Sequence, residues 1–506
     1  MERSKYSLKH YIYKERFQLL LLFIFLLLVY GIRLFTLSIT IDTEMIITDP
    51  ESLYNSWIAM GRWGLVFLKR ILGTYTFNVY VAAFMMILSA LATVVLWCYL
   101  FYMITGRRIG NSVCIFGIIW FTSPIMAEQE AFLLQAYEVT VAIGLIAISL
   151  ILVLEYRKDK KWHQILCSVT LLTISFATYQ AMVLMYITAS VMVFLVYYKN
   201  NANESDLKTK LKYISNLIEL FLFSYLAYTL TNMTLLYLLN LEMDIYIEAQ
   251  MLWGKQPIAV ILSNIKEHMW NMLSGNGFFY NRGLIGLYIL TLIILFLQKK
   301  TKDYWLYIIS MLFLFICPFL MVIIRGGRIQ YRTELTLPLV EAFLVLFILD
   351  FIWSRARKIY YVGLLFVLVV TINQVQLSAR LYYTSYINNV QSVILAIKIS
   401  DRIEQLDIDA KTTPVVFIGR KAYERNNSCL EKSDFELAGY GSFEISFSTM
   451  HGTAIMCNYL RTLGINYTIP NNEQITIAED LAENMKAWPD TSSVQYTNGI
   501  VIIKLS

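Results

Sequence analysis

Charged residues are scarce in this chain of 506 residues: Asp, Glu, Lys and Arg make up 15%, against 58% hydrophobic residues. A soluble protein of this length needs a larger polar surface, so the composition excludes an ordinary water-soluble enzyme. Several stretches run for about twenty residues without a charge, which is the length of a helix that crosses a bilayer. The sequence therefore predicts a polytopic membrane protein.

Nucleotide-binding signatures are absent. No G-x-G-x-x-G follows a predicted strand, and no G-x-x-x-x-G-K-[ST] occurs. Asp407-Ile-Asp409 spells the D-x-D of nucleotide-sugar transferases, but it lies between a predicted helix and a predicted strand, where we interpret it as a surface loop. The net charge of +6 reflects membrane topology, so we expect neither a nucleotide nor nucleic acid as a partner.

Histidine and cysteine are also few. The four histidines form no H-x-x-x-H or Cys-rich spacing, which argues against a structural zinc site. Four of the six cysteines lie in apolar runs, whereas Cys429 and Cys457 lie near the C-terminus and leave a disulfide open. The first apolar run has no small-residue cleavage site after it, so we expect it to stay as an anchor.

The apolar runs and the basic residues that end them predict roughly eleven membrane helices. We place them near residues 17–36, 78–104, 111–124, 138–155, 164–178, 180–198, 214–238, 284–298, 304–324, 336–353 and 359–378. Residues 1–378 are thus predicted to form the membrane domain.

Short basic loops set the expected orientation. Clusters such as Lys160-Lys161, Lys299-Lys300 and Arg355-Ala-Arg357 fall on one side with the basic N-terminus, which the positive-inside rule places in the cytoplasm. With an odd number of spans, residues 379–506 would lie outside the cell. We therefore expect a multi-pass protein of the plasma membrane with a C-terminal extracytoplasmic domain.

Residues 379–506 are polar and have the pattern of a small α/β domain. Residues 389–406 have helical periodicity, and Val415–Ile418 is typical of a buried strand. Residues 494–503 predict a hairpin around a type I′ turn at Asn498-Gly499.

The first extracytoplasmic loop, residues 37–76, is acidic and then amphipathic. Asp42, Glu44, Asp49 and Glu51 come first, and residues 51–72 then place Leu53, Trp57, Met60, Leu68 and Ile71 on one helical face. The carboxylates are consistent with a solvated loop, but a helix in the interface beside them would form a ledge at headgroup height. Such a ledge suits a lipid-linked substrate.

Arginines gather in a second extracytoplasmic loop, where the positive-inside rule does not favour them. Arg325, Arg328 and Arg332 lie within eight residues, and guanidinium groups bind phosphate through paired donors. Pairing with acidic side chains or lipid headgroups is the alternative. The acidic first loop favours the phosphate-binding interpretation.

Two further polar or aromatic groups are candidates for binding sugar. Tyr179 and Gln180 lie at an expected tight turn between two spans, where they either bind hydroxyls or satisfy the turn. The loop 239–283 contains Trp253, Trp270 and Phe278-Phe279-Tyr280, which either stack on sugar rings or belong to an interfacial aromatic belt.

The order of several short motifs resembles the GtrII-type glucosyltransferase family over nearly the whole chain. The motifs are Asp42-Thr-Glu44, Gly61-Arg62-Trp63-Gly64, Thr178-Tyr179-Gln180, Arg332-Thr-Glu334-Leu-Thr-Leu-Pro338 and Gly499-Ile-Val-Ile-Ile-Lys504-Leu. The resemblance implies a GT-C fold, a catalytic acid on the first outer loop, and a sugar donor linked to polyprenyl phosphate. It further implies transfer of the sugar, glucose by the family name, to a cell-surface glycan on the outer face of the membrane.

Carried onto this sequence, the resemblance makes Asp42 the first candidate for the catalytic carboxylate, Glu44 the second and Asp49 the third. One carboxylate would accept the proton of the attacking hydroxyl, and we expect it to be ionised near neutral pH without a large pKa shift. Arg62, Arg325, Arg328 and Arg332 would bind the donor phosphate.

Trp63, Tyr179 and Gln180 would bind substrate. Whether Asp42 and Glu44 also hold a Mg²⁺ or Mn²⁺ ion is left open by the sequence.

Two other functions remain open. A lipid-linked glycan transporter or flippase would show interrupted spans with charges at mid-membrane depth, whereas the acidic groups here gather at one face. A polysaccharide polymerase would share the polytopic fold and the arginine-rich outer loops, and only the family-like motifs separate it from a single-sugar transferase.

Overall fold

The computed structural model describes residues 7–105, 112–201, 206–275, 283–298, 302–409, 411–424, 426–430, 440–444 and 448–506. Within these ranges the chain is mainly helical. The helices are α2 (Leu8–Tyr30), η1 (Gly31–Leu34), α3 (Thr43–Thr48), α4 (Pro50–Ala59), α5 (Trp63–Ile71), α6 (Val79–Thr105), α7 (Ser112–Thr122), α8 (Pro124–Ala131), α9 (Ala136–Asp159), α10 (Trp162–Thr178), α11 (Ala181–Asn201), α12 (Leu207–Leu239), α13 (Tyr246–Ala249), α14 (Ile258–Ser274), α15 (Leu284–Leu297), α16 (Tyr304–Ile316), η2 (Cys317–Phe319), α17 (Leu320–Arg325), η3 (Tyr331–Thr333), α18 (Thr336–Arg355), α19 (Arg357–Glu404), α20 (Thr449–Thr462), α21 (Asn472–Ala482) and η4 (Thr491–Ser493). The strands are β1 (Val415–Ile418), β2 (Val494–Thr497) and β3 (Ile500–Lys504).

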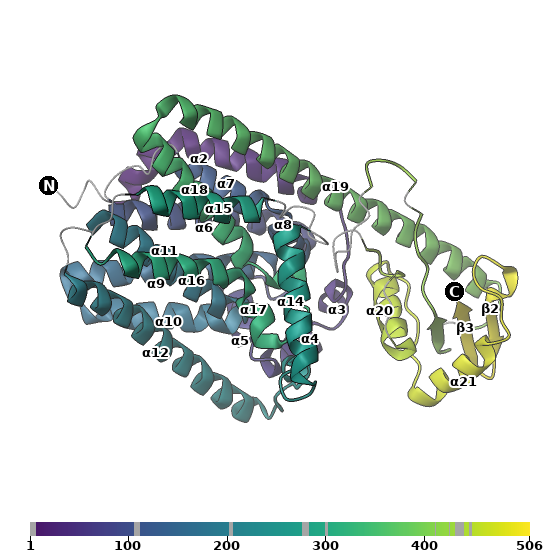
Figure 1. The fold of residues 1–506 in the computed structure, drawn as a ribbon. Coiled ribbons are helices and arrows are strands. Elements are labelled where there is room, and N and C mark those ends of the chain that lie inside the picture. The colour runs from purple at the N-terminus through teal and green to yellow at the C-terminus, as the bar shows by residue number, and fades with distance from the viewer. Residues whose placement is uncertain are drawn as a thin grey trace.

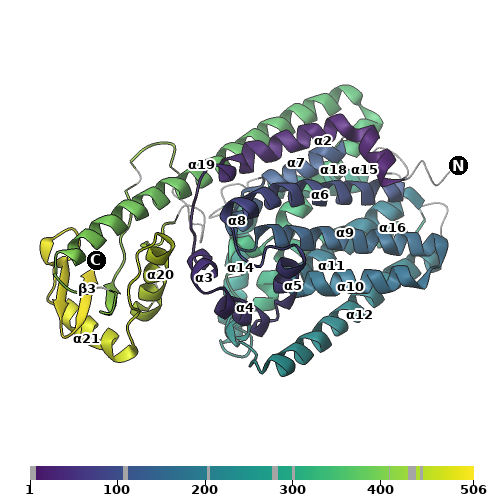
Figure 2. The same ribbon diagram turned by 180° about the vertical axis from the view of Figure 1, so that it is seen from behind.

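The long helices form one bundle (Figures 1 and 2). In the described part of the chain, eight helical segments are long and apolar enough to cross a membrane, which confirms a membrane protein. Three further predicted spans correspond to α7, α10 and α15, of 11, 17 and 14 residues. A helix of 11 residues is only about 16 Å long, about half of a bilayer core, so the count of eleven spans stays a prediction.

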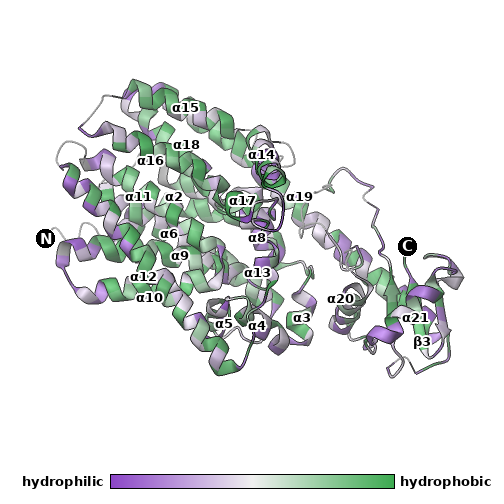
Figure 3. Cartoon of the chain, turned by 60° about the horizontal axis from the view of Figure 1, so that its bottom comes forward, coloured by the Kyte–Doolittle hydropathy of each residue, from purple (hydrophilic) through white to green (hydrophobic). Residues whose placement is uncertain are grey.

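Hydropathy follows this arrangement, because apolar residues fill the bundle and polar residues gather at its ends (Figure 3). The N-terminus and the connections α9–α10 and α18–α19 lie at one end (Figures 1 and 2). Helices α3, α4, α5, α8 and α14 lie at the opposite end, called the site end below. The described basic connections and the predicted acidic loop are thus on opposite sides of the bundle.

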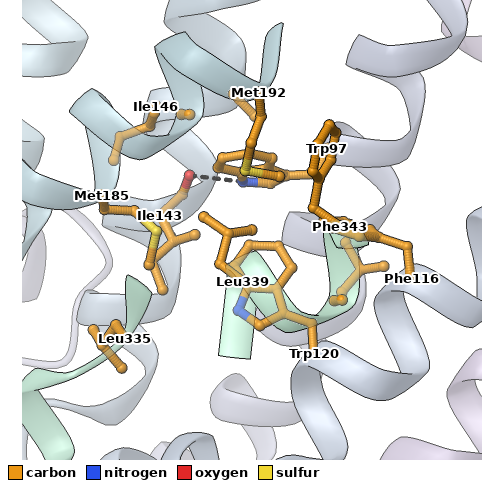
Figure 4. Close-up of a cluster of buried hydrophobic side chains, with 14 of the residues drawn as sticks. Trp97, Phe116, Trp120, Ile143, Ile146, Met185, Met192, Leu335, Leu339 and Phe343 are labelled. Atoms are coloured by element: carbon orange, nitrogen blue, oxygen red, sulfur yellow. Dashed lines mark hydrogen bonds between the residues drawn. The ribbon is translucent and has the colours of Figure 1, made fainter. Parts of the chain in front are cut away.

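Aromatic and aliphatic side chains pack together in the buried core of the bundle (Figure 4). The Trp97 and Trp120 rings meet edge to face with centroids 5.2 Å apart, and the Trp97 indole donates to the Ile143 carbonyl at 3.2 Å. Most buried indole N–H groups have a hydrogen-bond partner, and for Trp97 this bond supplies one between α6 and α9. This core packs α6, α7, α9 and α18 against one another and so fixes their relative positions.

Helix α19 continues through the predicted domain boundary at residue 378 without a break and carries the chain away from the bundle (Figure 1). The strands beyond it form one sheet in the order β1-β3-β2, with β1 parallel and β2 antiparallel to β3. The predicted strand at Val415–Ile418 and the predicted hairpin are confirmed, with positive φ angles of 54° and 75° at Asn498 and Gly499.

Helices cover both faces of this sheet. Residues of α19 and α20 pack on one face, and residues of α21 pack on the other. Helix α21 starts with a capping box, in which Asn471 and Gln474 each accept from the other's backbone N–H. Cys457 is buried and Cys429 is exposed, and both thiols are free, so the structure contains no disulfide between them.

The single amphipathic helix predicted for residues 51–72 is wrong, because the segment forms two helices, α4 and α5. The chain turns at Gly61, whose φ of +78° is costly for any residue with a side chain. Leu53, Trp57 and Leu68 are buried inside the protein, whereas Ile71 is exposed. The break places Arg62 at the start of α5 instead of on a continuous helical face.

Candidate active site

The two leading carboxylates lie side by side at the start of α3. Asp42 is the N-cap residue and has a left-handed backbone conformation, with φ 63°. This conformation aims its N–H group at Glu44 Oε1, at 3.2 Å. Asp42 remains partly exposed, whereas Glu44 is buried and its Oε2 atom has no hydrogen-bond partner. The loop therefore holds one accessible and one enclosed carboxylate together.

Arg62 is fixed by the turn between α10 and α11. Its Nε donates to Gln180 Oε1 at 2.9 Å, and its guanidinium group lies 5.2 Å from the centre of the Tyr179 ring. Gln180 in turn donates to the Met60 carbonyl at 2.9 Å. Because Nε makes this bond, the two Nη groups stay directed by a rigid guanidinium plane, as phosphate binding requires.

The glycines on either side of Arg62 allow this placement. A Cβ atom on Gly64 would lie 2.6 Å from the Ile174 carbonyl oxygen, so α5 approaches the backbone of α10 more closely than any other residue permits. Gly61 supplies the turn that precedes the helix. The two glycines of the motif Gly61-Arg62-Trp63-Gly64 thus allow the turn and the close packing that hold Arg62 in position.

Arg332 approaches the same carboxylate from a distant part of the sequence. It lies in η3, and its guanidinium group is 5.1 Å from the centre of the Phe132 ring. Arg332, Arg62 and His451 are the positive or titratable groups that interact electrostatically with Asp42. The structure therefore brings together Asp42, Glu44, Arg62 and Arg332 at the site end.

His451 belongs to α20, which packs against α3. The contact continues before α3, where the Ile39 N–H donates to Asn389 Oδ1 of α19 at 3.4 Å and the Ile39 side chain joins the core beneath the sheet. The region that follows the bundle thus supports the acidic loop directly. Nothing in the sequence pattern of residues 379–506 indicated this contact.

Burial changes the acid–base chemistry from what we expected. It raises the pKa of Asp42, and Arg332, Arg62 and His451 oppose that rise. It raises the pKa of Glu44 to about 8, with Asp42 as the second cause. The expectation of a carboxylate without a large pKa shift is wrong for Glu44, which is withdrawn from water. The cations favour the ionised form of Asp42, whereas burial keeps Glu44 protonated at neutral pH.

The other predicted polar residues take different places. Asp49 is exposed and caps α4, accepting from the Ser52 N–H at 3.3 Å. Arg325 ends α17 and donates to Gln250. Arg328 forms an exposed ion pair with Glu267 on α14. The three arginines of this loop thus have separate partners, and Arg332 is the one beside Asp42.

The predicted aromatic residues are also placed. Trp63 begins α5 with its ring edge to face with Phe67, and its indole N–H is buried without a hydrogen-bond partner. The Trp253 indole donates to the Ile323 carbonyl at 2.9 Å, and Trp270 is exposed. Phe278, Phe279 and Tyr280 lie outside the described residues.

The sequence did not indicate a contact between the Arg332-Thr-Glu334 motif and α14. Glu334 of the Arg332-Thr-Glu334 motif is buried, and its Oε1 lies 2.6 Å from His268 Nε2 of α14. This contact ties α14 to the segment that carries Arg332. No spacing rule relates His268 to Glu334, which are 66 residues apart.

A row of buried polar residues in α8 was missed as well. Glu128, Gln129 and Glu130 are buried, and Glu130 accepts from the Thr140 hydroxyl at 2.5 Å. Nearby, Lys69 of α5 and Glu138 of α9 form a fully buried ion pair. Polar residues between two apolar runs are costly in a membrane protein, and this signal was available in the sequence.

The Mg²⁺ or Mn²⁺ ion that the sequence left open stays a prediction. The described residues contain no group of three or more His, Cys, Asp or Glu side chains that could hold a metal ion. Asp42 and Glu44 alone supply two carboxylates, one of which accepts a backbone N–H, and two guanidinium groups already lie close to Asp42. Among the described residues, Arg332, Arg62 and His451 are the groups whose charge favours ionised Asp42.

Comparison with protein families matches residues 31–349 to the family described as glucosyl transferase GtrII. The matched range contains Asp42, Glu44, Arg62 and Arg332 and ends before α19. The comparison with curated proteins and the comparison with solved structures each give no match.

Proposed function

Because the chain belongs to the glucosyl transferase GtrII family, we propose that it moves a sugar, glucose by the family description, from a polyprenyl-phosphate donor to a cell-surface glycan. Family membership makes the chain a glycosyltransferase, and its apolar helices make it a membrane protein. The lipid-phosphate donor, the glycan acceptor and a GT-C fold belong to the proposal.

One observation carries this proposal: two carboxylates and two arginines meet at the site end, although they come from residues 42–44, 62 and 332. A leaving phosphate needs positive charge, and an attacking hydroxyl needs a base. The four side chains supply both requirements at one place. A lipid-linked donor can reach that place with its tail still in the bilayer.

The reaction proceeds by attack of an acceptor hydroxyl on the anomeric carbon of the donor sugar. The new C–O bond forms as the bond from the anomeric carbon to the phosphate oxygen breaks, and polyprenyl phosphate leaves with the electron pair. The hydroxyl proton passes to Asp42. Arg62 and Arg332 neutralise the charge that grows on the phosphate, and Glu44 in its protonated form adds no repelling charge.

The expected orientation is part of the same proposal. The described basic connections lie at the end opposite the site, and the positive-inside rule puts them in the cytoplasm (Figures 1 and 2). The site end then faces the outside of the plasma membrane, where glycan acceptors are found. A cysteine introduced at exposed Asp49 should react with a membrane-impermeant thiol reagent in intact cells.

A polymerase is the second candidate, because it would use the same acids and arginines with two lipid-linked glycans. A transporter is disfavoured, since α3 and α5, the helices at which Asp42, Glu44 and Arg62 lie, are at one end of the bundle (Figures 1 and 2).

The test is transfer of labelled sugar from synthetic polyprenyl-phosphate glucose to membrane glycan by vesicles that contain the wild-type chain, Asp42→Asn or Asp49→Asn. Loss of a general base costs about 10²- to 10⁴-fold, so Asp42→Asn should lower transfer by that factor while Asp49→Asn stays active. Turnover near normal in Asp42→Asn would exclude it as the base. Product that carries several sugars from lipid-linked glycans would favour the polymerase.

A further inference from the structure

Helix α12 borders the bundle and is apolar over most of its exposed surface. Leu222, Phe223, Leu226, Leu230 and Met233 are all exposed, as expected of a helix that faces lipid. Two polar side chains on the same helix behave differently, because Tyr228 and Asn232 turn toward α4 and α5 and are largely enclosed. An amide on a lipid-facing helix is costly, which makes its position informative.

Both side chains lie against the turn that presents Arg62. The Tyr228 hydroxyl donates to the Gly61 carbonyl at 3.2 Å. A Cβ atom on Gly61 would lie 2.6 Å from the Tyr228 hydroxyl oxygen and 3.7 Å from Asn232 Oδ1. Asn232 is 8% exposed, and its Oδ1 atom has no hydrogen-bond partner. A buried acceptor therefore stands beside the residue that precedes Arg62.

Trp63, the residue that follows Arg62 in the chain, supplies a buried donor. The Trp63 indole N–H is enclosed and has no hydrogen-bond partner. A buried polar group without a partner costs about 1–3 kcal/mol, and here an unmatched acceptor lies beside Gly61 while an unmatched donor belongs to Trp63, the residues directly before and after Arg62 in the chain. Both groups would be satisfied by a ligand that enters the site.

The chemistry of the two groups indicates the class of ligand. Asn232 Oδ1 needs a hydrogen-bond donor, which an ionised phosphate does not have. Trp63 Nε1 needs an acceptor. A sugar hydroxyl serves as either. Because these groups belong to, or lie beside, the chain neighbours of Arg62, which holds the phosphate in the proposed function, the sugar in question is the one bonded to that phosphate.

We propose that Asn232 and Tyr228 of α12, together with Trp63 of α5, form a hydroxyl-binding subsite for the sugar of the lipid-linked donor. This inference rests on the proposed function. It assigns the choice of sugar to the junction of α12 with α5. In this arrangement Asn232 and Trp63 contact the sugar, whereas Tyr228 positions the Gly61 turn through its bond to the carbonyl.

The experiment uses the reconstituted full chain and compares polyprenyl-phosphate glucose with its four monodeoxy analogues. A site that hydrogen-bonds a hydroxyl rejects the analogue that lacks it. Wild type should therefore use at least one deoxy donor with a kcat/KM at least about tenfold lower than that for glucose. Trp63→Phe, which removes the N–H group but keeps an aromatic ring, should lose about tenfold with the full sugar and little with that deoxy donor.

Asn232→Leu should behave in the same way toward one deoxy donor. Matched controls are Trp305→Phe and Asn373→Leu, two exposed positions on α16 and α19, which should leave both donors unaffected. If Asn232→Leu does not fold, Asn232→Ala and Trp63→Phe carry the comparison.

The two failures are distinguishable. Transfer by wild type together with unchanged discrimination among deoxy donors in Trp63→Phe and in the Asn232 variant would overturn the subsite alone. No transfer by wild type from any sugar donor would overturn the proposed function and the subsite with it.

Discussion

Replacement of Glu44 by Gln should stabilise the protein, and increasingly so as the pH rises. The pKa of Glu44 is raised from 4.5 to about 8, first by burial and then by Asp42. The folded protein therefore keeps a proton that the unfolded chain releases above about pH 4.5. Stability is lost as the pH rises from about 4.5 to about 8, because the unfolded state gains from ionisation in that window. A glutamine has no such dependence.

The magnitude follows from the two pKa values. Each pH unit between them is worth about 1.4 kcal/mol, so burial of the protonated acid costs roughly 3 kcal/mol at pH 7 and roughly 5 kcal/mol above pH 8. Glu44→Gln should exceed wild type in stability by up to these amounts, with little difference near pH 4.5.

Equilibrium unfolding in detergent, measured near pH 5 and near pH 8.5, tests this prediction. Glu51→Gln is the matched control, since Glu51 is exposed and accepts from the Tyr75 hydroxyl at 2.7 Å. A stability difference between Glu44→Gln and wild type that is the same at both pH values would refute a buried protonated Glu44. Transfer activity should also fall above about pH 8 in wild type, where Glu44 ionises beside the donor phosphate, and should not fall in Glu44→Gln.

Three further outcomes are expected. Arg332→Lys should raise the apparent KM for the donor about tenfold or more, because lysine lacks the paired donors, while the exposed Arg328→Lys should leave it unchanged; equal effects would argue against a phosphate role for Arg332. Lys69→Met leaves Glu138 buried without its partner and should cost about 3–5 kcal/mol in the same unfolding assay, whereas the double change to Met and Gln should recover much of that loss. Transfer by wild type should persist in EDTA, since the arginines supply the positive charge, and full inactivation that added Mg²⁺ reverses would contradict this.

Much of the membrane region could be predicted because a bilayer imposes length and charge rules on any helix that crosses it. Each predicted span lies mostly on helical residues of the described chain. The hairpin at Asn498-Gly499 could be predicted because a type I′ turn requires two positive φ angles. The break at Gly61 was missed, since glycine within an amphipathic pattern fits a helix or a turn.

The candidate site was predictable only in part. The shared motif order placed Asp42, Glu44, Arg62 and Arg332 in one group, and the structure brings them together. Local composition made Arg325 and Arg328 look equivalent to Arg332, because partners such as Gln250 and Glu267 come from a distant loop.

The pKa values of the carboxylates could not be predicted for the same reason. They depend on enclosure by elements that no spacing relates to the acidic loop.

Helix α19 sets the distance between the bundle and the sheet of the C-terminal region. It is continuous over 48 residues, so it measures about 72 Å and transmits both height and rotation. One inserted residue above the bundle would turn everything beyond it by about 100° and lift α20 off α3, whereas seven would restore the angle at a height increased by about 10 Å. The contact between α20 and the acidic loop at α3 therefore depends on both the length and the helical phase of α19.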